Sequence, residues 1–506
     1  VATLMPQPVV LKSKPGLKRD GTRFDGENYI DSQWCRWQRG LPRKMGGCRS
    51  VTSAIPERVY GMRADSVNGA QYAHLGGAST LTQIIMDNQG LITGLNARIP
   101  AGFANSADNL WQFESFYDTV GGALLVLAHA APNLSSIDST VERPIYRGTL
   151  TASAALTSTG TPGQSGGIVV LAPYLLTFGN SGRVEISDAN DPNTISTTAY
   201  VTGTKIVRGL PTRGSGSGPS GLLWSLDSVI RATFTSASAG FFAFDTISGD
   251  SSILSSQSVI EYDGIYYWLG VDRPLMFNGV VREIPNEQNL NDFYDNVNFA
   301  YRQKVYAYKV PRFGEIWWCY PRGNATECTH ALIYNVRENT WYDTQLLGQG
   351  RSAGYFTKVY QKPFMVDVDL TGTGYTMWQH ETGVDQINGS SVQPIQSYFE
   401  TAELSLLVGP EPRDSSIRIS RAEVDFVQVG DLTLTVKGRS NARAPIESSE
   451  VFTFPDTASS PSEQVVNTKE ARRLMSFKFE SNVAGGDYQL GQTLALIEPS
   501  DQRFAS

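Results

Sequence analysis

The stretch SVIEYDGIYYWLGVDRPLMFNGVVREI, residues 258–284, carries the pattern that decides the fold. An aromatic run is followed by a polar turn, and a second run then ends beside Asn278-Gly279. The stretch FGEIWWCYPRGNATECTHALIYNVRENTWYD, residues 313–343, repeats this plan, and residues 174–191 follow it more loosely. Short aromatic and aliphatic runs closed by turn residues are typical of strands in sandwiches, barrels or propellers.

Related units recur along the chain with a spacing of about 40 to 55 residues, which is typical of β-propeller blades. Each blade buries its faces only against its neighbours, so the sequence predicts a degenerate propeller of five to seven blades. One exception is Leu290, Phe293, Tyr294 and Val297, whose spacing predicts a short amphipathic helix near 287–299. The polar run GSGSGPSG, residues 214–221, predicts an exposed loop.

The composition agrees with an all-β chain of two or three domains. The 506 residues include 48 Gly and 25 Pro, and only 18% are charged, a profile rich in turns. The four Cys and four His show no zinc or haem spacing, so no cofactor or metal is expected, and the chain is expected to form in a reducing compartment. The longest apolar run, ALLVLAHAA from Ala123, predicts one buried strand rather than a membrane span, and the start lacks the apolar core of a signal peptide.

One hairpin can be predicted in register. If Gly323-Asn324 forms a two-residue turn, Cys319 faces Cys328 and Trp317 faces His330. We therefore expect the two cysteines to be adjacent and reduced.

The pattern changes from about Val392. A hairpin around Gly430-Asp431 would place Val427 opposite Leu434 and Val429 opposite Leu432. Farther on, Met475, Phe477 and Phe479 alternate with polar residues, which predicts a half-buried antiparallel sheet. We expect three parts: an extended N-terminal arm at 1–57, a propeller at 58–390 and a C-terminal β-sandwich at 391–506.

The arm is basic, whereas the rest of the chain is acidic. Residues 12–49 hold ten Lys and Arg against four Asp and Glu, in a chain of net charge −7. Such an arm suggests a docking segment, although a solvated leader is the alternative. Stacking of its tryptophans on nucleic-acid bases is a third option, which Gly40, Pro42 and the acidic body disfavour. The candidate docking residues are Trp34, Arg36, Trp37, Arg39, Arg43 and Lys44.

Catalytic patterns are weak. Arg98-Ile99-Pro100 matches a short element of sialidases, but residues 335–343 lack the Asp and Gly of an Asp box. Asp367 and Asp369 share one face of a predicted strand, where a wet sheet face explains them without catalysis. We expect no enzyme; a glycan-binding propeller is the alternative function.

The order of these features resembles a known family. GENYIDSQWCRWQRGLPRKMGG at 26–47, the repeats, the stretch 168–193, the short helix and ARRLMSFKFES at 471–481 together resemble the packaged-DNA stabilisation proteins of short-tailed bacteriophages, also called tail hub or nozzle proteins. The resemblance spans nearly the whole chain.

That resemblance implies a structural protein of the virion tail, assembled in the cytoplasm of a bacterial host. It implies a ring, usually of six copies, below the portal and the head-to-tail adaptor, with fibres or tailspikes and a needle or plug as further partners. The ring would extend the DNA channel, retain packaged DNA and conduct it on ejection without binding a specific sequence. The six candidate residues would then contact the adaptor or a neighbouring subunit.

Overall fold

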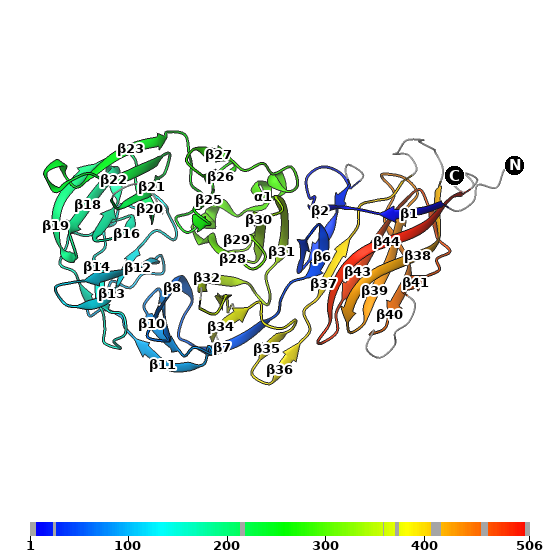
Figure 1. The fold of residues 1–506 in the computed structure, drawn as a ribbon, viewed down its shortest axis with the longest axis horizontal. Helices are drawn as coiled ribbons and strands as arrows, with labels where there is room; N and C mark the ends of the chain where they lie inside the picture. The colour runs from blue at the N-terminus through cyan, green and yellow to red at the C-terminus, as the bar shows by residue number, and fades with distance from the viewer. Residues whose placement is uncertain are drawn as a thin grey trace.

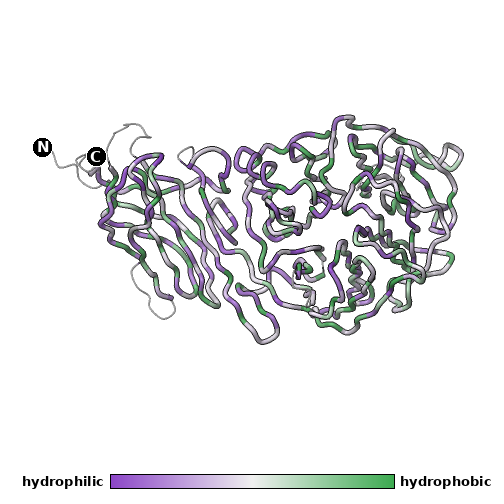
Figure 2. Tube along the Cα trace, turned by 180° about the vertical axis from the view of Figure 1, so that it is seen from behind, coloured by the Kyte–Doolittle hydropathy of each residue, from purple (hydrophilic) through white to green (hydrophobic). Residues whose placement is uncertain are grey.

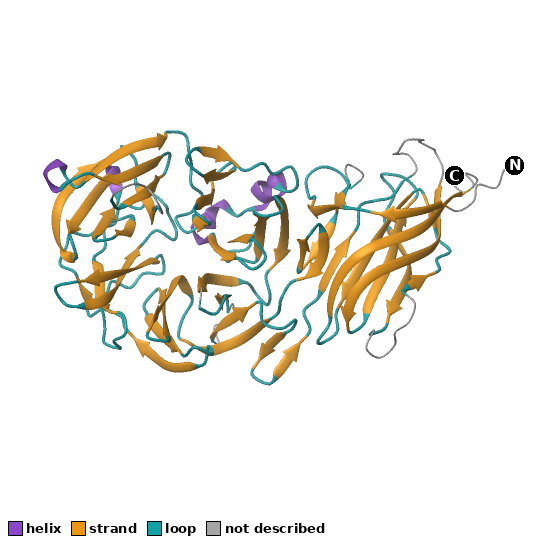
Figure 3. Ribbon diagram, in the orientation of Figure 1, coloured by secondary structure: helices purple, strands orange, loops and turns teal. Residues whose placement is uncertain are grey.

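The computed structural model describes residues 7–23, 27–212, 218–357, 359–369, 374–405, 416–456 and 464–500. Strands dominate, with only short helical segments between them (Figure 3). Figure 1 shows two bodies side by side, a ring of small sheets and a sandwich of longer strands. The predicted all-β architecture, a propeller-like repeat domain followed by an antiparallel sandwich, is confirmed.

Seven sheets form the ring within the described residues, six of them antiparallel and the seventh mixed. In each of them the first strand lies innermost: contacts between these first strands run from β24 through β28 and β32 to β8, and on through β12 and β16 to β20. The first three blades are β8 (Val59–Val67), β9 (Ala70–Gly77), β10 (Leu81–Met86) and β11 (Ile92–Ala97); β12 (Leu110–Asp118), β13 (Ala123–Ala131), β14 (Ile145–Thr149) and β15 (Thr157–Ser158); and β16 (Gly167–Leu171), β17 (Tyr174–Phe178), β18 (Arg183–Asp188) and β19 (Asp191–Tyr200).

The next three blades follow in chain order. They are β20 (Ile206–Pro211), β21 (Ser220–Ser225), β22 (Val229–Phe234) and β23 (Phe242–Ser248); β24 (Ile260–Tyr262), β25 (Ile265–Leu269), β26 (Pro274–Phe277) and β27 (Val281–Glu283); and β28 (Tyr306–Val310), β29 (Glu315–Tyr320), β30 (His330–Asn335) and β31 (Thr340–Gln345). The helical segments are η1 (Asn180–Gly182), η2 (Ala237–Ala239), α1 (Leu290–Asn296) and η3 (Phe299–Lys304).

The aromatic run of residues 258–284 explains how blades hold together. Trp268 packs on Trp224 of the preceding blade with ring centroids 5.7 Å apart, and Tyr267 packs on Tyr334 of the following blade at 6.1 Å. Adjacent residues of a strand point to opposite faces, so each aromatic pair joins a different neighbour. Such a pair contributes about 0.5–1.5 kcal/mol beyond the area that it buries.

The seventh blade is closed by the N-terminal part of the chain. Its sheet has the order β32 (Arg351–Thr357), β33 (Lys362–Asp367), β34 (Tyr375–His380), β7 (Cys48–Ile55), β35 (Gln386–Asn388) and β36 (Ser391–Gln393). β7 pairs antiparallel with β34 and parallel with β35. A strand from the beginning of the chain, β7, therefore completes the last blade and closes the ring.

The sandwich also combines both ends of the chain. One sheet has the order β41-β38-β44-β6-β5, with β1 beside β44 and β42 beside β38, and the other has the order β4-β37-β43-β39-β40. The strands from the N-terminal segment are β1 (Gln7–Leu11), β4 (Asp31–Gln33), β5 (Cys35–Gln38) and β6 (Leu41–Lys44), while β2 (Lys14–Leu17) and β3 (Asn28–Tyr29) form a separate parallel pair. The other strands are β37 (Ser397–Glu400), β38 (Ser416–Val429), β39 (Leu432–Arg439), β40 (Glu447–Phe454), β41 (Val465–Val466), β42 (Ala471–Arg472), β43 (Leu474–Ser481) and β44 (Asp487–Ser500).

These ladders correct the predicted boundaries. The segment 1–57 was expected as an arm separate from 58–390 and 391–506, but β4 pairs with β37, β6 pairs with β44, and β7 belongs to the propeller sheet. The described part of the sandwich thus joins β1, β4, β5 and β6 to the strands after β36. The arm's apolar positions, such as Trp34 and Trp37, are buried against sheets that lie hundreds of residues away in sequence.

The predicted hairpin register at 319–328 is wrong by three residues. Cys319 pairs with Ala331 and Tyr320 with His330. The tip of the hairpin is held by the helical segment instead of forming a tight turn, because Gly323 N–H donates to the Asn296 carbonyl and Asn298 N–H donates to the Pro321 carbonyl. Both cysteines are free, as predicted, and Cys328 Sγ lies 3.5 Å from the Cys319 carbonyl oxygen.

The predicted hairpin at Gly430-Asp431 is also wrong. β38 pairs with β44 in one sheet, whereas β39 pairs with β40 and β43 in the other, so the turn crosses between sheets. The core is filled from both sheets, as in the contact of Phe426 with Phe454, while Val427 is 75% exposed. Figure 2 shows the alternation of hydrophobic and hydrophilic residues along the sandwich strands.

Several other predictions are confirmed. α1 occupies the centre of the expected helix at 287–299, with Phe293 and Val297 buried. The run ALLVLAHAA forms the single strand β13, and Met475, Phe477 and Phe479 are buried in β43. Half of the predicted exposed loop at 214–221 lies outside the described residues, which end at 212 and resume at 218. Its last two residues contradict the prediction, because Ser220 and Gly221 begin the buried strand β21.

Candidate functional site

The six candidate docking residues lie at the joint between the propeller and the sandwich. Four of these side chains are buried within their own chain, with exposed fractions of 1–2%: Trp34, Arg36, Trp37 and Lys44. Arg39 is exposed and Arg43 is half-buried. The four buried side chains are therefore not available to an adaptor or a neighbouring subunit, which corrects their predicted role.

Arg36 of β5 forms the centre of the joint. Its Nε lies 2.8 Å from Glu315 Oε1, and its NH1 donates to Glu381 Oε2 at 2.9 Å. The guanidinium carbon is 3.8 Å from the centroid of the Phe313 ring, within the range of a cation–π contact. Arg36 thereby links a sandwich strand to the sixth blade and to the end of the seventh.

Glu315 is buried as completely as Arg36. It accepts hydrogen bonds from Tyr342 Oη at 2.7 Å and from Trp317 Nε1 at 2.8 Å. Burial raises the pKa of Glu315, and the positive charge of Arg36 opposes that shift. A buried carboxylate depends on such partners, so the loss of Arg36 would leave an uncompensated charge.

Two tryptophans, one before and one after Arg36 in the sequence, pack in the joint. Trp34 N–H donates to Thr344 Oγ1 at 2.9 Å, and its ring lies 6.0 Å from that of Trp317 in an edge-on arrangement. The Trp37 ring lies 5.2 Å from Tyr342 and 5.3 Å from Tyr29. The mixture of Trp and Arg that suggested an adhesive surface is thus an internal interface.

Lys44, Gly46 and Gly47 lie where the chain passes from the sandwich into the propeller. Lys44 Nζ donates to the Gly486 carbonyl at 2.7 Å, and burial lowers the pKa of this lysine. A Cβ on Gly47 would lie 2.2 Å from the Asp385 carbonyl oxygen, so only glycine permits this close approach. The sequence KMGG therefore reflects tight packing of two backbones.

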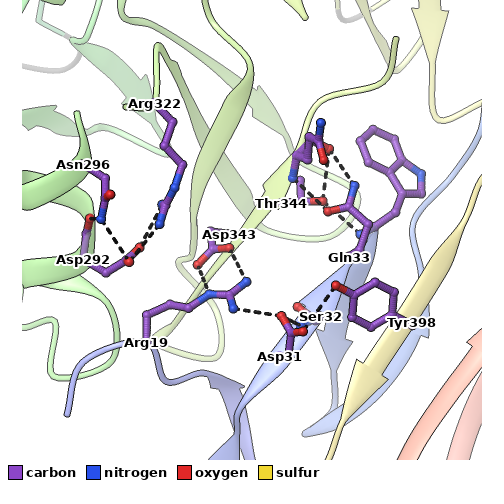
Figure 4. A network of polar contacts seen from close by, with 12 residues as sticks. Arg19, Asp31, Ser32, Gln33, Asp292, Asn296, Arg322, Asp343, Thr344 and Tyr398 are labelled. Carbon is purple, nitrogen blue, oxygen red and sulfur yellow. Dashed lines mark hydrogen bonds and ion pairs between the residues drawn. The ribbon is translucent and has the colours of Figure 1, made fainter. Parts of the chain in front are cut away.

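A second polar network crosses the joint through Arg19 (Figure 4). Its guanidinium donates to both carboxylate oxygens of Asp343 in β31, at 3.1 and 3.0 Å, and to Asp31 of β4 at 2.8 Å. Asp20 accepts hydrogen bonds from the N–H groups of Asn291 and Asp292, at the start of α1. Sequence reasoning missed Arg19 as a joint residue because Asp343, its partner in the propeller, lies 324 residues away in the chain.

A cavity of about 250 Å³ lies at the centre of the ring. Its walls come from the inner strands β8, β12, β20, β28 and β32, from residues 257–259 and from the start of β24. On one wall, Arg63 NH1 donates to Glu114 Oε2 at 2.7 Å, and its Nε lies 3.1 Å from Asp65 Oδ2. On another, Lys309 Nζ donates to the Glu261 carbonyl at 2.7 Å. Arg208 also lines the cavity.

The residues considered for catalysis have structural roles. Arg98 is buried and donates to the carbonyls of Ala154 and Thr149, both at 2.9 Å. Asp367 accepts hydrogen bonds from Thr376 N–H at 2.8 Å and Trp378 Nε1 at 3.0 Å. Asp369 accepts from Gly374 N–H at 2.7 Å. These contacts fix strand ends and loops of the propeller.

Among the described residues, no group of three or more His, Cys, Asp or Glu side chains could hold a metal ion. The helices in this part of the chain are all too short to cross a membrane.

Comparison with known proteins does not assign this chain to a family. No protein-family model matches this sequence, and no curated protein matches it. Among solved structures, the chain is similar to Raptor from Chaetomium thermophilum, with 8% identity and a TM-score of 0.41. The match covers 67% of this chain and 29% of the Raptor chain, so this chain spans less than a third of that structure. A similarity at this level carries no inference about function.

Proposed function

We propose that this chain is a structural subunit of a short-tailed phage virion, a tail nozzle or hub subunit that extends the DNA channel. The proposal rests on the resemblance of its sequence features and their order to tail hub proteins. In this reading the subunit assembles as a ring, usually of six copies, below the adaptor, and acts without catalysis. It retains packaged DNA, conducts it on ejection and presents a surface to fibres or tailspikes.

The observation that carries the proposal is the joint itself. Residues 27–47, part of one of the stretches on which the resemblance rests, hold the propeller and the sandwich together through the buried Arg36 and its two glutamates. The chain also crosses between the two domains twice, once between β6 and β7 and once between β36 and β37. A subunit built in this way transmits load between its domains, as a conduit under the pressure of packaged DNA requires.

The charge distribution agrees with a conduit. The chain carries a net charge of −7, and a ring would multiply that charge. An acidic wall disfavours phosphate contacts, because fewer condensed counterions are released from DNA. DNA would then pass through the lumen without lasting adhesion.

Under this proposal, fewer of the predicted docking residues can contact the adaptor. Since Arg36 and Lys44 are buried, their replacement would disturb folding as well as assembly. Arg39 is exposed at the turn between β5 and β6, and the half-buried Arg43 follows it. We assign adaptor contact to this pair.

The test is co-assembly with the adaptor ring of the same virion, followed by electron microscopy. We expect a ring of subunits on the adaptor, and about tenfold weaker assembly for Arg39→Ser/Arg43→Ser, because exposed cations steer and pair at such interfaces. Arg49→Ser, an exposed arginine on β7, is the matched control. A chain that stays monomeric with the adaptor and binds glycans instead would reject the proposal.

A further inference from the structure

The central cavity of the propeller contains a cation with too few partners. Arg208 of β20 lines this cavity and is only partly exposed. Its Nε is fully covered and has no hydrogen-bond partner among the described residues. A charged group that is taken out of water without a new hydrogen bond is destabilised. Burial accordingly lowers the pKa of Arg208.

The neighbouring arginine shows the opposite situation. Arg63 is held by Asp65, by Glu114 and by Ser115 Oγ, which accepts from NH2 at 3.0 Å. Glu114 attracts Arg208 as well, but its carboxylate is already bound to Arg63 at 2.7 Å. The propeller thus provides partners for the guanidinium of Arg63, whereas the guanidinium of Arg208 remains available to a ligand.

Three cations line the cavity: Arg63, Arg208 and Lys309. Arg63 is paired with Asp65 and Glu114, which lie outside the lining. Lys309 is occupied by Glu261 through the contacts at 2.7 and 3.3 Å. The available donor is therefore the guanidinium of Arg208, whose planar shape matches the two oxygens of a carboxylate.

Size and lining define the rest of the ligand. A cavity of about 250 Å³ is smaller than the pockets that take drug-sized molecules, roughly 300–1,000 Å³. The half-buried rings of Tyr355 and Phe356 supply apolar surface beside the polar groups. We propose that the centre of the propeller binds a small organic carboxylate of about the size of an acidic monosaccharide, with Arg208 as the bidentate partner of its carboxylate. This site does not depend on the proposed virion role.

The experiment is isothermal titration of the full chain with sodium D-glucuronate, with neutral D-glucose and inorganic phosphate titrated in parallel. We expect saturable binding of glucuronate and none of glucose. Arg208→Gln should weaken that binding by about tenfold or more, because a charge-assisted bidentate contact is lost. The matched control is Arg273→Gln, a residue outside the cavity that pairs with the exposed Asp250, and it should bind like the wild type.

A stability measurement separates binding from folding. Because the buried Nε of Arg208 has no hydrogen-bond partner among the described residues, Arg208→Gln should unfold at the same temperature as the wild type or a higher one when no ligand is present. If this variant does not fold, Arg208→Lys keeps the charge but loses the fork, and it should bind glucuronate several-fold more weakly. The absence of saturable binding, equal affinity in the Arg208 variants, or equal affinity for glucose would overturn the proposal. Arg208-dependent binding of phosphate alone would overturn the assignment to carboxylates.

Discussion

The propeller and the sandwich are built from the chain in opposite ways. Each of the first six blades comes from one continuous stretch, such as 260–283 for β24–β27. The sandwich instead pairs the two ends of the chain, as Gln7 with Ile497 and Asp31 with Glu400. Local strand pairs close small loops, whereas pairs hundreds of residues apart carry a larger loss of chain entropy. Assembly of the sandwich therefore carries a larger loss of chain entropy than formation of a single blade.

The seventh blade is the place where this difference is sharpest. Its fourth strand, β7, follows β6 of the sandwich after only residues 45–47. Closure of the ring and assembly of the sandwich are thus coupled through one short segment.

The largest expected effect comes from removing that segment. A chain beginning at Glu57 lacks β7 and the sandwich strands β1, β4, β5 and β6. We expect loss of cooperative folding, because the change exposes the core of both domains and exceeds the total stability of about 5–15 kcal/mol typical of proteins. Thermal unfolding and size-exclusion chromatography would measure this.

Co-expression of residues 1–56 with the shortened chain is the control, and it should restore a folded complex. If the shortened chain alone unfolded at the same temperature as the wild type, the propeller would close without β7. The proposed coupling between the propeller and the sandwich would then be wrong.

The next largest effect is expected at Arg36. Arg36→Met leaves Glu315 buried without its cation and should lower the free energy of unfolding by about 3–5 kcal/mol. Chemical denaturation would measure it. The double variant Arg36→Met/Glu315→Gln removes both charges and should recover much of the loss. A double variant no more stable than Arg36→Met would mean that packing on Phe313, and not the ion pair, dominates the joint.

A smaller effect is expected on the pH dependence of stability, which should differ between the two domains. All four histidines, at 74, 129, 330 and 380, lie in the propeller. Burial lowers the pKa of His74 to about 3 and that of His129 to about 4, below the ordinary value near 6.5. The unfolded chain therefore takes up protons between pH 6.5 and 4 that the folded chain does not. Stability is full above about pH 6.5 and falls as the pH decreases, by about 2 kcal/mol for each of these two residues at pH 5.

Hydrogen exchange followed by mass spectrometry at pH 7.5 and pH 5 would resolve the domains. We expect the propeller to lose protection at pH 5 and the sandwich to keep it. His129→Gln should reduce the loss near β13, because a neutral amide replaces the ring that donates to the Gln164 carbonyl. Equal loss of protection in both domains would contradict a histidine origin.

The repeat pattern was enough to predict the propeller because its contacts are local. The aromatic pairs around Tyr267 and Trp268 serve adjacent blades, and the alternation at Met475, Phe477 and Phe479 appears directly as burial in β43. The periodicity of a strand shows which of its residues are buried, and it can be read from the sequence without knowing the partner strand. The same property explains why α1 was predicted close to its observed position.

The register errors have the opposite origin. At Cys319 and Cys328 a tight turn was locally plausible, but contacts with Asn296 and Asn298 favoured a wider connection. At Gly430-Asp431 the turn joins two different sheets, because Phe426 and Leu432 must both fill one core. Turn residues fix a change of direction but do not specify which strand becomes the neighbour.

The sequence by itself determined that the chain is all-β, that repeated blades precede an alternating sheet, and that Trp34 to Lys44 form an unusual basic and aromatic segment. Only the tertiary structure decided that this segment is internal, that β7 closes the ring, and that Arg36 lies between Glu315 and Glu381. The physical reason is that a charged residue has the same local pattern whether its partner is solvent, another protein or its own distant carboxylates. Burial in a shared core distinguishes these cases, and that depends on which strands meet.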